Sequence, residues 1–145
     1  MRLLSILVIV ALAGFCATRY LVNQDAAVLE SAARSIGAGL RQARNRALND
    51  NRPATFLLDT VKRVFRVPGE RRQHVLPSGI TIASHTMRAE RLDERRGAIR
   101  FFPDGTSTGG RIALYTERVR YLVSVDWLTG EVGVIASVVE EAVGR

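Results

Sequence analysis

An apolar N-terminal stretch constrains this chain more than any other feature. From Leu3 to Val22 the sequence carries a single charge, Arg19, in 20 residues. As an α-helix this stretch would be about 30 Å long, close to the thickness of a bilayer's hydrocarbon core. We therefore expect residues 1–22 to form a membrane anchor helix. The residues expected to form the membrane anchor are Leu3, Leu4, Ile6, Leu7, Val8, Ile9, Val10 and Leu12.

Two other interpretations of this stretch compete with a retained anchor. A cleaved secretory signal would use Ala11 to Ala13 as its cleavage site. A lipoprotein signal ending at Cys16 is disfavoured, because the bulky Phe15 stands where a small residue is required. The retained anchor is favoured because a helical pattern resumes after it without a proline or a linker.

That helical pattern occupies residues 25–50. Apolar residues recur there with spacings of three and four, which predicts one buried helical face. Most of them are small, which favours close packing against a sheet, against neighbouring subunits, or both. Asn23 or Asp25 could cap a separate helix, and Asn49 to Pro53 should end it. The face consists of Val28, Ala32, Ile36, Leu40, Ala43 and Ala47, widened by Leu29, Ala33 and Leu48.

After Pro53 the hydrophobic period changes from 3.6 to about 2, which is typical of strands. Turn signals such as Pro103-Asp104-Gly105 and Thr129-Gly130 separate the apolar segments, while residues 88–96 form a charged stretch expected to be a solvated loop. The prediction is an α+β fold, with a long N-terminal helix packed on a C-terminal antiparallel sheet or two-sheet sandwich. Residues 1–22 would be the anchor, 23–52 an amphipathic helix continuing it, and 53–145 a β-rich domain. The expected strands are 54–59, 61–67, 80–84, 98–102, 111–115, 119–126 and 132–136.

The sequence contains no pattern typical of catalysis or metal binding. The single cysteine cannot form an intrachain disulfide or a structural zinc site. His74 and His85 lack partners at metal-ligand spacing, and Asp104 alone is a poor calcium site for an ion that takes six or more oxygens. We therefore predict a protein that is not an enzyme and that needs no cofactor or metal.

Basic residues give the chain a formal net charge of +7. Five of them surround Phe65, where they could contact an anion or DNA, or could form a solvated hairpin face. These residues are Lys62, Arg63, Arg66, Arg71 and Arg72.

Two C-terminal motifs resemble those of the minor pseudopilin H family of type II secretion, a pilin-like group. They are IRFFPDGTSTGGRI, at residues 99–112, and VDWLTGEV, at residues 125–132. The helix segment LRQARNRAL (40–48) and the following RPATF (52–56) are similar to the same family. The residues expected to specify the family's domain are Phe102, Pro103, Asp104, Gly105, Gly109, Gly110, Trp127 and Gly130. Trp127 is expected in the core, because it follows an alternating strand.

The resemblance implies a structural subunit near the tip of the type II secretion pseudopilus, with a single helix in the bacterial inner membrane and the C-terminal domain in the periplasm. It implies other minor and major pseudopilins as partners, and exported cargo as a further one. An alternative is a type IV minor pilin that binds DNA through its basic surface.

The resemblance also implies N-terminal processing and methylation, and a glutamate five residues into the mature chain. A carboxylate in an apolar bundle needs a cation, which the amino terminus of a neighbouring subunit can supply. Aligning the apolar run places Met1 at the mature first position and Ser5 at the glutamate position. This departure suggests a subunit that needs no partner above it.

Overall fold

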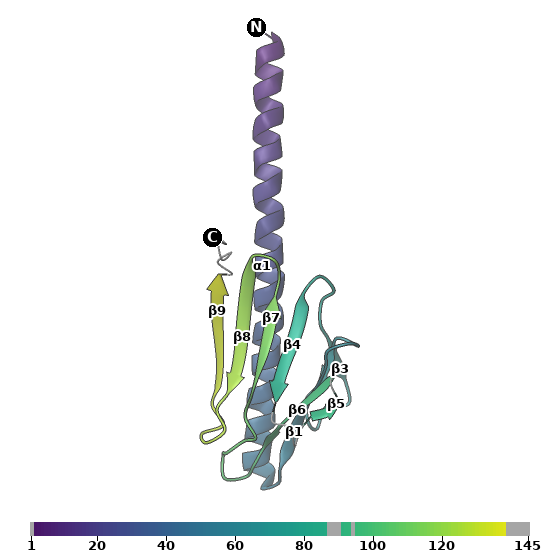
Figure 1. The fold of residues 1–145 in the computed structure, drawn as a ribbon, viewed down its shortest axis with the longest axis vertical. Coiled ribbons are helices and arrows are strands. Elements are labelled where there is room, and N and C mark those ends of the chain that lie inside the picture. Colours follow the sequence, from purple (N-terminus) through teal and green to yellow (C-terminus); the bar gives the residue numbers. More distant parts are fainter. Residues whose placement is uncertain (1, 87–90, 94, 139–145) are drawn as a thin grey trace, which may run out of the picture.

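The computed structural model describes residues 2–86, 91–93 and 95–138, and consists of one long helix followed by short strands (Figure 1). The helix is α1 (Arg2–Asp50). The strands are β1 (Ala54–Asp59), β2 (Val64–Arg66), β3 (Gln73–Val75), β4 (Thr81–Thr86), β5 (Arg91–Asp93), β6 (Arg96–Phe101), β7 (Gly110–Tyr115), β8 (Val119–Val125) and β9 (Val132–Val138).

Helix α1 runs without a break through the apolar stretch and the amphipathic segment. No proline interrupts it between Arg2 and Asp50. Because no helix begins at Asn23 or Asp25, neither residue acts as an N-cap. The predicted end is confirmed, because the helix stops at Asp50 and Asn51 follows with φ 51°, a left-handed conformation common after helices.

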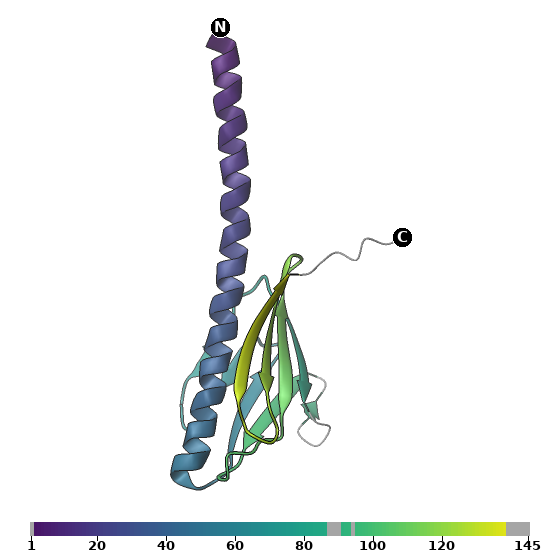
Figure 2. The same cartoon turned by 90° about the vertical axis from the view of Figure 1, so that its left-hand side faces the viewer.

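The strands form two antiparallel sheets, which confirms the α+β prediction and, of its two alternatives, the arrangement with two sheets. One sheet has the order β3-β2-β1-β6-β5 and the other the order β4-β7-β8-β9. Helix α1 contacts β1 and β6 of the first sheet and β7, β8 and β9 of the second. Figure 2 shows that only the C-terminal half of α1 lies against the sheets, while its N-terminal half projects beyond them.

The buried face of α1 is slightly rotated from the predicted one. Leu29 and Ala33 lie in its centre, whereas Val28 and Leu48 are 41% and 39% exposed. Small residues bring the helix close to both sheets, since a Cβ on Gly39 would lie 3.1 Å from Phe56 Cε2 of β1. The helix residues in the core are Leu29, Ala32, Ala33, Ile36, Leu40, Ala43 and Ala47.

Three strand predictions need correction. The strand expected at 61–67 is shorter, because the Asp59 carboxylate accepts hydrogen bonds from Val61 N and Lys62 N and Arg63 has φ 55°, which together make a turn. Strand β3 was not predicted. The charged stretch 88–96 is not a loop throughout, since β5 and the first residue of β6 lie in it, while 88–90 and 94 fall outside the described residues.

Candidate assembly surfaces

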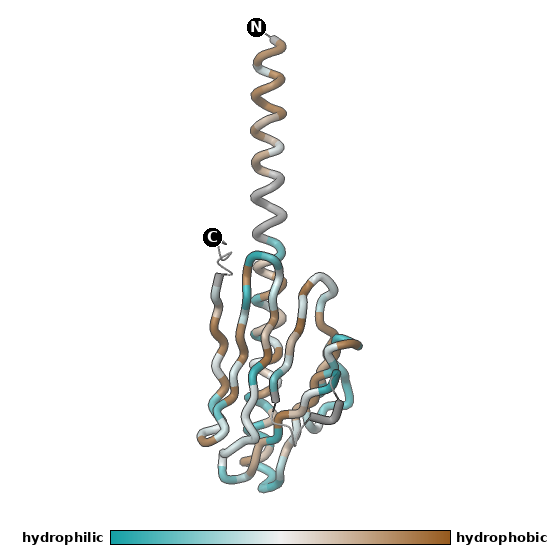
Figure 3. The backbone as a smooth tube through the Cα atoms, in the orientation of Figure 1, coloured by the Kyte–Doolittle hydropathy of each residue, from teal (hydrophilic) through white to brown (hydrophobic). Residues whose placement is uncertain are grey.

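The N-terminal half of α1 exposes its apolar side chains. Leu3 is 82% exposed and Leu7 69%, and the residues from Leu3 to Cys16 are exposed throughout. Figure 3 shows mostly hydrophobic residues, in brown, along the helix near its N-terminus. Apolar surface of this extent is stabilised by lipid or by other helices. In the described residues, no helical segment combines the length and hydropathy needed to cross a membrane.

The residues predicted to specify the domain converge on two loops. In the first, the Asp104 carboxylate accepts hydrogen bonds from Thr106 N (2.9 Å) and Thr106 Oγ1 (2.6 Å), and Gly105 turns the chain with φ 91°. These hydrogen bonds lower the pKa of Asp104 below its usual value, because they favour the charged carboxylate. Asp104 therefore closes its own loop, where a metal ligand had been a weak alternative.

The second loop joins β8 to β9 and has the same chemistry. Asp126 Oδ1 accepts hydrogen bonds from Thr129 N and Leu128 N, both at 2.8 Å, and these contacts lower the pKa of Asp126. Ser107, which is buried, links the two loops. Its Oγ donates to Asp126 O at 2.8 Å and its backbone N donates to Trp127 O at 2.8 Å.

Two arginines of α1 fix the second loop and the start of β9 to the helix. Arg44 Nη2 donates to Thr129 O at 3.2 Å, and Arg41 Nη2 donates to Val132 O at 3.3 Å. Gly130 lies so close to the first loop that a Cβ would stand 2.2 Å from Gly105 O. Residue spacing along α1 gives no signal that these two arginines reach carbonyls 85 and 91 residues away in sequence.

Trp127 is not a core residue, and that prediction was wrong. The alternation of β8 ends at the buried Val125, and Asp126 then begins the turn, so Trp127 leaves the strand and is 61% exposed. Trp127 borders a groove of about 730 Å³ that His85, Arg111 and Glu131 also line. Gly109, Gly110 and Gly133 also line that groove and contribute no side chains to it.

The five predicted basic residues do not form one surface. The Arg63 guanidinium donates to Pro77 O (2.9 Å) and to Ile80 O (2.6 and 2.7 Å), so it holds the chain before β4 to the hairpin. Lys62 and Arg66 line a groove of about 200 Å³ together with Arg96, while Arg71 and Arg72 are exposed outside it. The sequence did not predict that Arg96 would join this groove. Arg96 reaches it because β6 pairs with β1, which places Arg96 opposite Asp59, 37 residues away in sequence.

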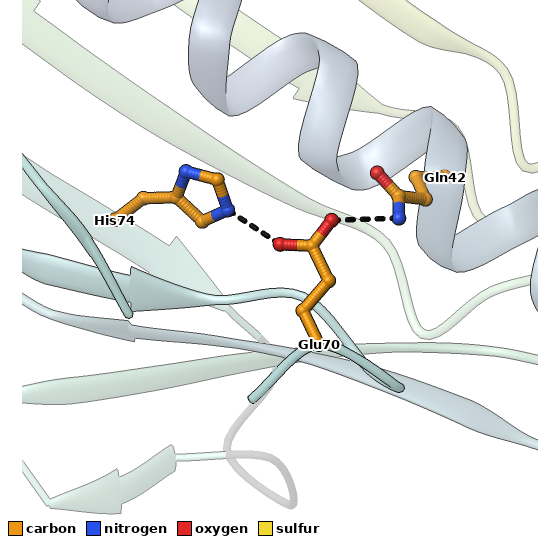
Figure 4. A network of polar contacts seen from close by, with 3 residues as sticks. All are labelled: Gln42, Glu70 and His74. Carbon is orange, nitrogen blue, oxygen red and sulfur yellow. Dashed lines mark hydrogen bonds and ion pairs between the residues drawn. The ribbon is translucent and has the colours of Figure 1, made fainter. Parts of the chain in front are cut away.

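A polar network ties the β2–β3 hairpin to α1 (Figure 4). Glu70 Oε2 lies 2.6 Å from His74 Nε2, and Gln42 Nε2 donates to Glu70 Oε1 at 2.7 Å. The hydrogen bond with His74 and then that with Gln42 lower the pKa of Glu70. The His74 ring stacks on Phe65, with centroids 4.7 Å apart. His74 is thus a structural residue of β3, and His85 is an exposed residue of β4.

Metal binding finds no support in the part of the chain that the structure describes. Within 2–86, 91–93 and 95–138, no three His, Cys, Asp or Glu residues gather where they could hold an ion.

Comparison with known proteins gives the family. Residues 32–130 match the family of the type II transport protein GspH. The type II secretion system protein H of Xanthomonas campestris pv. campestris is 37% identical over 133 residues, covering 91% of this chain and 78% of that protein.

Solved structures share the fold at lower identity. The minor pseudopilin EpsH of the Vibrio cholerae type 2 secretion system matches with a TM-score of 0.57 and 11% identity, over 74% of this chain and 95% of EpsH. The type IV minor pilin FimU of Pseudomonas aeruginosa matches with a TM-score of 0.53 and 14% identity, over 73% of this chain and 91% of FimU. The extent of the family match and the identity to protein H decide the assignment: this chain belongs to the GspH family, the structural, non-enzymatic minor pseudopilins of type II secretion.

Proposed function

We propose that this chain is assembled near the tip of the type II pseudopilus and serves protein export across the outer membrane. Residues 1–22 would hold it in the bacterial inner membrane, and residues 53–145 would lie in the periplasm. Its partners would be other minor and major pseudopilins, and exported cargo would contact the β domain.

One observation carries the proposal. The same continuous helix supplies the core of the β domain with its C-terminal half and exposes an apolar surface with its N-terminal half. An assembly in which this half packs among lipids and neighbouring helices would cover that surface. The eight anchor residues named above, Leu3 to Leu12, would make these contacts.

The motif loops support a rigid domain at the other end of α1. Asp104, Gly105 and Gly130 fix the shape of the two loops, and the loops present Trp127 at the surface. Exposed tryptophans are common at the energetic centre of protein interfaces. We assign the groove beside Trp127 as a contact surface for another subunit.

Ser5 supports a position at the tip. A subunit with a serine where the family resemblance implies a glutamate offers no carboxylate to the amino terminus of a neighbour. Replacing Ser5 with Glu should therefore lower the chain's preference for the tip, seen as recovery of the chain along sheared pseudopili. Unchanged assembly of Ser5→Glu would remove the support that Ser5 gives.

The full chain, extracted in mild detergent, tests the proposal by co-purification with the other minor pseudopilins of the same organism. A defined complex by size exclusion is expected, and Trp127→Ala should weaken it by about 2 kcal/mol if the groove is an interface. The surface variant Leu128→Ala, next to Trp127 and 58% exposed, is the matched control. Failure of the wild-type chain to join any other pseudopilin would contradict the proposal.

A further inference from the structure

The outer face of the first sheet, opposite α1, carries a small basic groove. Its cations come from three segments: Lys62 from the β1–β2 turn, Arg66 from β2 and Arg96 from the start of β6. Sheet pairing brings them together, because Arg66 lies opposite Leu57 of β1 and Arg96 lies opposite Asp59 of the same strand. The groove has a volume of about 200 Å³, and Leu57 and Val64 form apolar walls between the cations.

The groove carries a net positive charge, because its three cations outnumber the one carboxylate among its lining residues, that of Asp59. The ion pairs among described residues join Arg34 to Glu30, Arg46 to Asp50 and His74 to Glu70, and none includes a groove cation. Asp59 is the one carboxylate lining the groove in this part of the chain, and its Oδ1 already accepts hydrogen bonds from Val61 N and Lys62 N. Gln73, a neutral residue, accepts from the Arg66 guanidinium in the amide orientation that satisfies both groups. This contact orients Arg66 without reducing its charge.

From these observations we infer that the groove binds an acidic polypeptide segment of a partner protein. Carboxylates would pair with Lys62, Arg66 and Arg96, and the aliphatic parts of glutamate or aspartate side chains would pack on Leu57 and Val64. Lys62, Arg66 and Arg96 are exposed, so a carboxylate paired with one of them alone would gain little. Three cations around one groove can pair with several carboxylates of the same segment at once, which strengthens binding.

A nucleic acid fits the same face less well. Proteins that bind single strands stack bases on aromatic rings. The aromatic residues of the described strands of this sheet, Phe56, Phe65 and Phe101, are at most 1% exposed and face α1 and the core. A duplex would need cations along several phosphates, whereas three are gathered here around a small volume. The inference concerns the β domain alone and does not depend on a position at the pseudopilus tip.

Fluorescence anisotropy with the full chain in mild detergent tests the groove. The probes are a labelled oligoglutamate peptide, an oligoglutamine peptide of equal length and an oligothymidine strand. The groove variant is Lys62→Gln/Arg66→Gln/Arg96→Gln. The matched control, Arg52→Gln/Arg71→Gln/Arg72→Gln, removes the same charge from exposed positions outside the groove.

Oligoglutamate should bind the wild-type chain, oligoglutamine should not, and the groove variant should bind oligoglutamate about tenfold more weakly while the control changes about twofold or less. Equal losses in both variants would show a bulk charge effect and overturn the inference. Tighter binding of oligothymidine, lost in the groove variant, would replace it with a nucleic-acid site. If the groove variant melts at a lower temperature, Lys62→Arg/Arg66→Lys/Arg96→Lys must retain binding for the inference to stand.

Discussion

At the scale of single residues, glycines and short polar side chains determine how the two motif loops meet. Gly130 has φ 68° and approaches Gly105 O so closely that no larger residue fits without movement of the backbone. Gly79 has φ 90°, but nothing lies within 4 Å of where its Cβ would be. Substitutions at Gly79 and Gly130 therefore separate two costs in stability: that of a left-handed conformation, and that of a steric collision.

Gly130→Ala should therefore destabilise the chain more than Gly79→Ala. A left-handed alanine costs about 1–2 kcal/mol, which both variants share. The collision with Gly105 O should bring the loss for Gly130→Ala to about 3 kcal/mol or more. Urea unfolding of the full chain in mild detergent measures both, and equal losses would mean that the loops separate without cost.

The polar network around Glu70 predicts a dependence of stability on pH. The pKa of Glu70 in the folded chain lies below the ordinary value of 4.5. The contribution of Glu70 to the free energy of unfolding is fully present at pH values above that ordinary value. It is lost as the pH falls through the pKa of the folded chain, because in this range the unfolded chain binds more protons than the folded one. Asp104 and Asp126, whose pKa values are lowered in the same direction, add to this acid sensitivity.

Glu70→Gln should consequently flatten the decline in unfolding free energy between neutral and acid pH. The variant should be less stable than wild type at neutral pH and should approach it as the pH falls below 4.5. Unfolding curves at a series of pH values measure the two slopes. Glu117→Gln, an exposed position outside the network, is the control and should leave the slope unchanged. Parallel slopes for wild type and Glu70→Gln would show that the network contributes nothing.

At the scale of elements, α1 contributes a packed face to the β domain. Leu40 lies in the middle of that face and is fully buried, whereas Val28, near its start, is 41% exposed. Leu40→Ala should cost about 3 kcal/mol, because it removes apolar contacts and leaves a cavity, and Val28→Ala should cost less than about 1 kcal/mol. Thermal or urea unfolding compares them, and a Leu40→Ala chain as stable as wild type would show that the helix does not belong to the core.

The longer elements could be predicted from the sequence because their periods are long and regular. The end of α1 and both ends of β1 are where Pro53, the asparagines and the alternation of residues 54–59 placed them. Strands β3 and β5 could not be predicted in this way. Each has three residues at the edge of a sheet, where backbone pairing with one neighbour suffices and no apolar alternation is needed.

The surfaces were harder to predict than the elements. The eight motif residues were identified through the family resemblance, and the structure places them mostly in two adjoining loops. The exposure of Trp127 depends on where β8 ends, and the groove at Lys62 depends on Arg96 arriving through strand pairing. The spacing of neighbouring residues predicts neither the exposure of Trp127 nor the position of Arg96, because both depend on contacts between segments that are distant in sequence.

At the scale of the whole molecule, the chain combines an exposed apolar rod with a small folded domain (Figure 2). Leu7→Lys/Val10→Lys should move most of the chain out of the membrane fraction, since a lysine in the middle of an inserted helix costs about 2.5–3.5 kcal/mol. The β domain should stay folded, because neither residue contacts it. Val61→Lys, at an exposed apolar position of the β domain, is the matched control. Membrane fractionation with protease protection checks the result, and a double variant that stays in the membrane would contradict the proposed anchor.

The proposed assembly of α1 beside the helices of other pseudopilins can be measured by crosslinking through Cys16. Cys16 is the chain's single cysteine and lies exposed on the projecting half of α1. Secreting cells would carry a second pseudopilin with one cysteine introduced at the aligned helix position, and a short bismaleimide would be added. We predict a crosslinked heterodimer that disappears in Cys16→Ser and is not restored by adding Val61→Cys to that variant. Absence of the heterodimer, with Cys16 freely labelled by a water-soluble maleimide, would contradict the account.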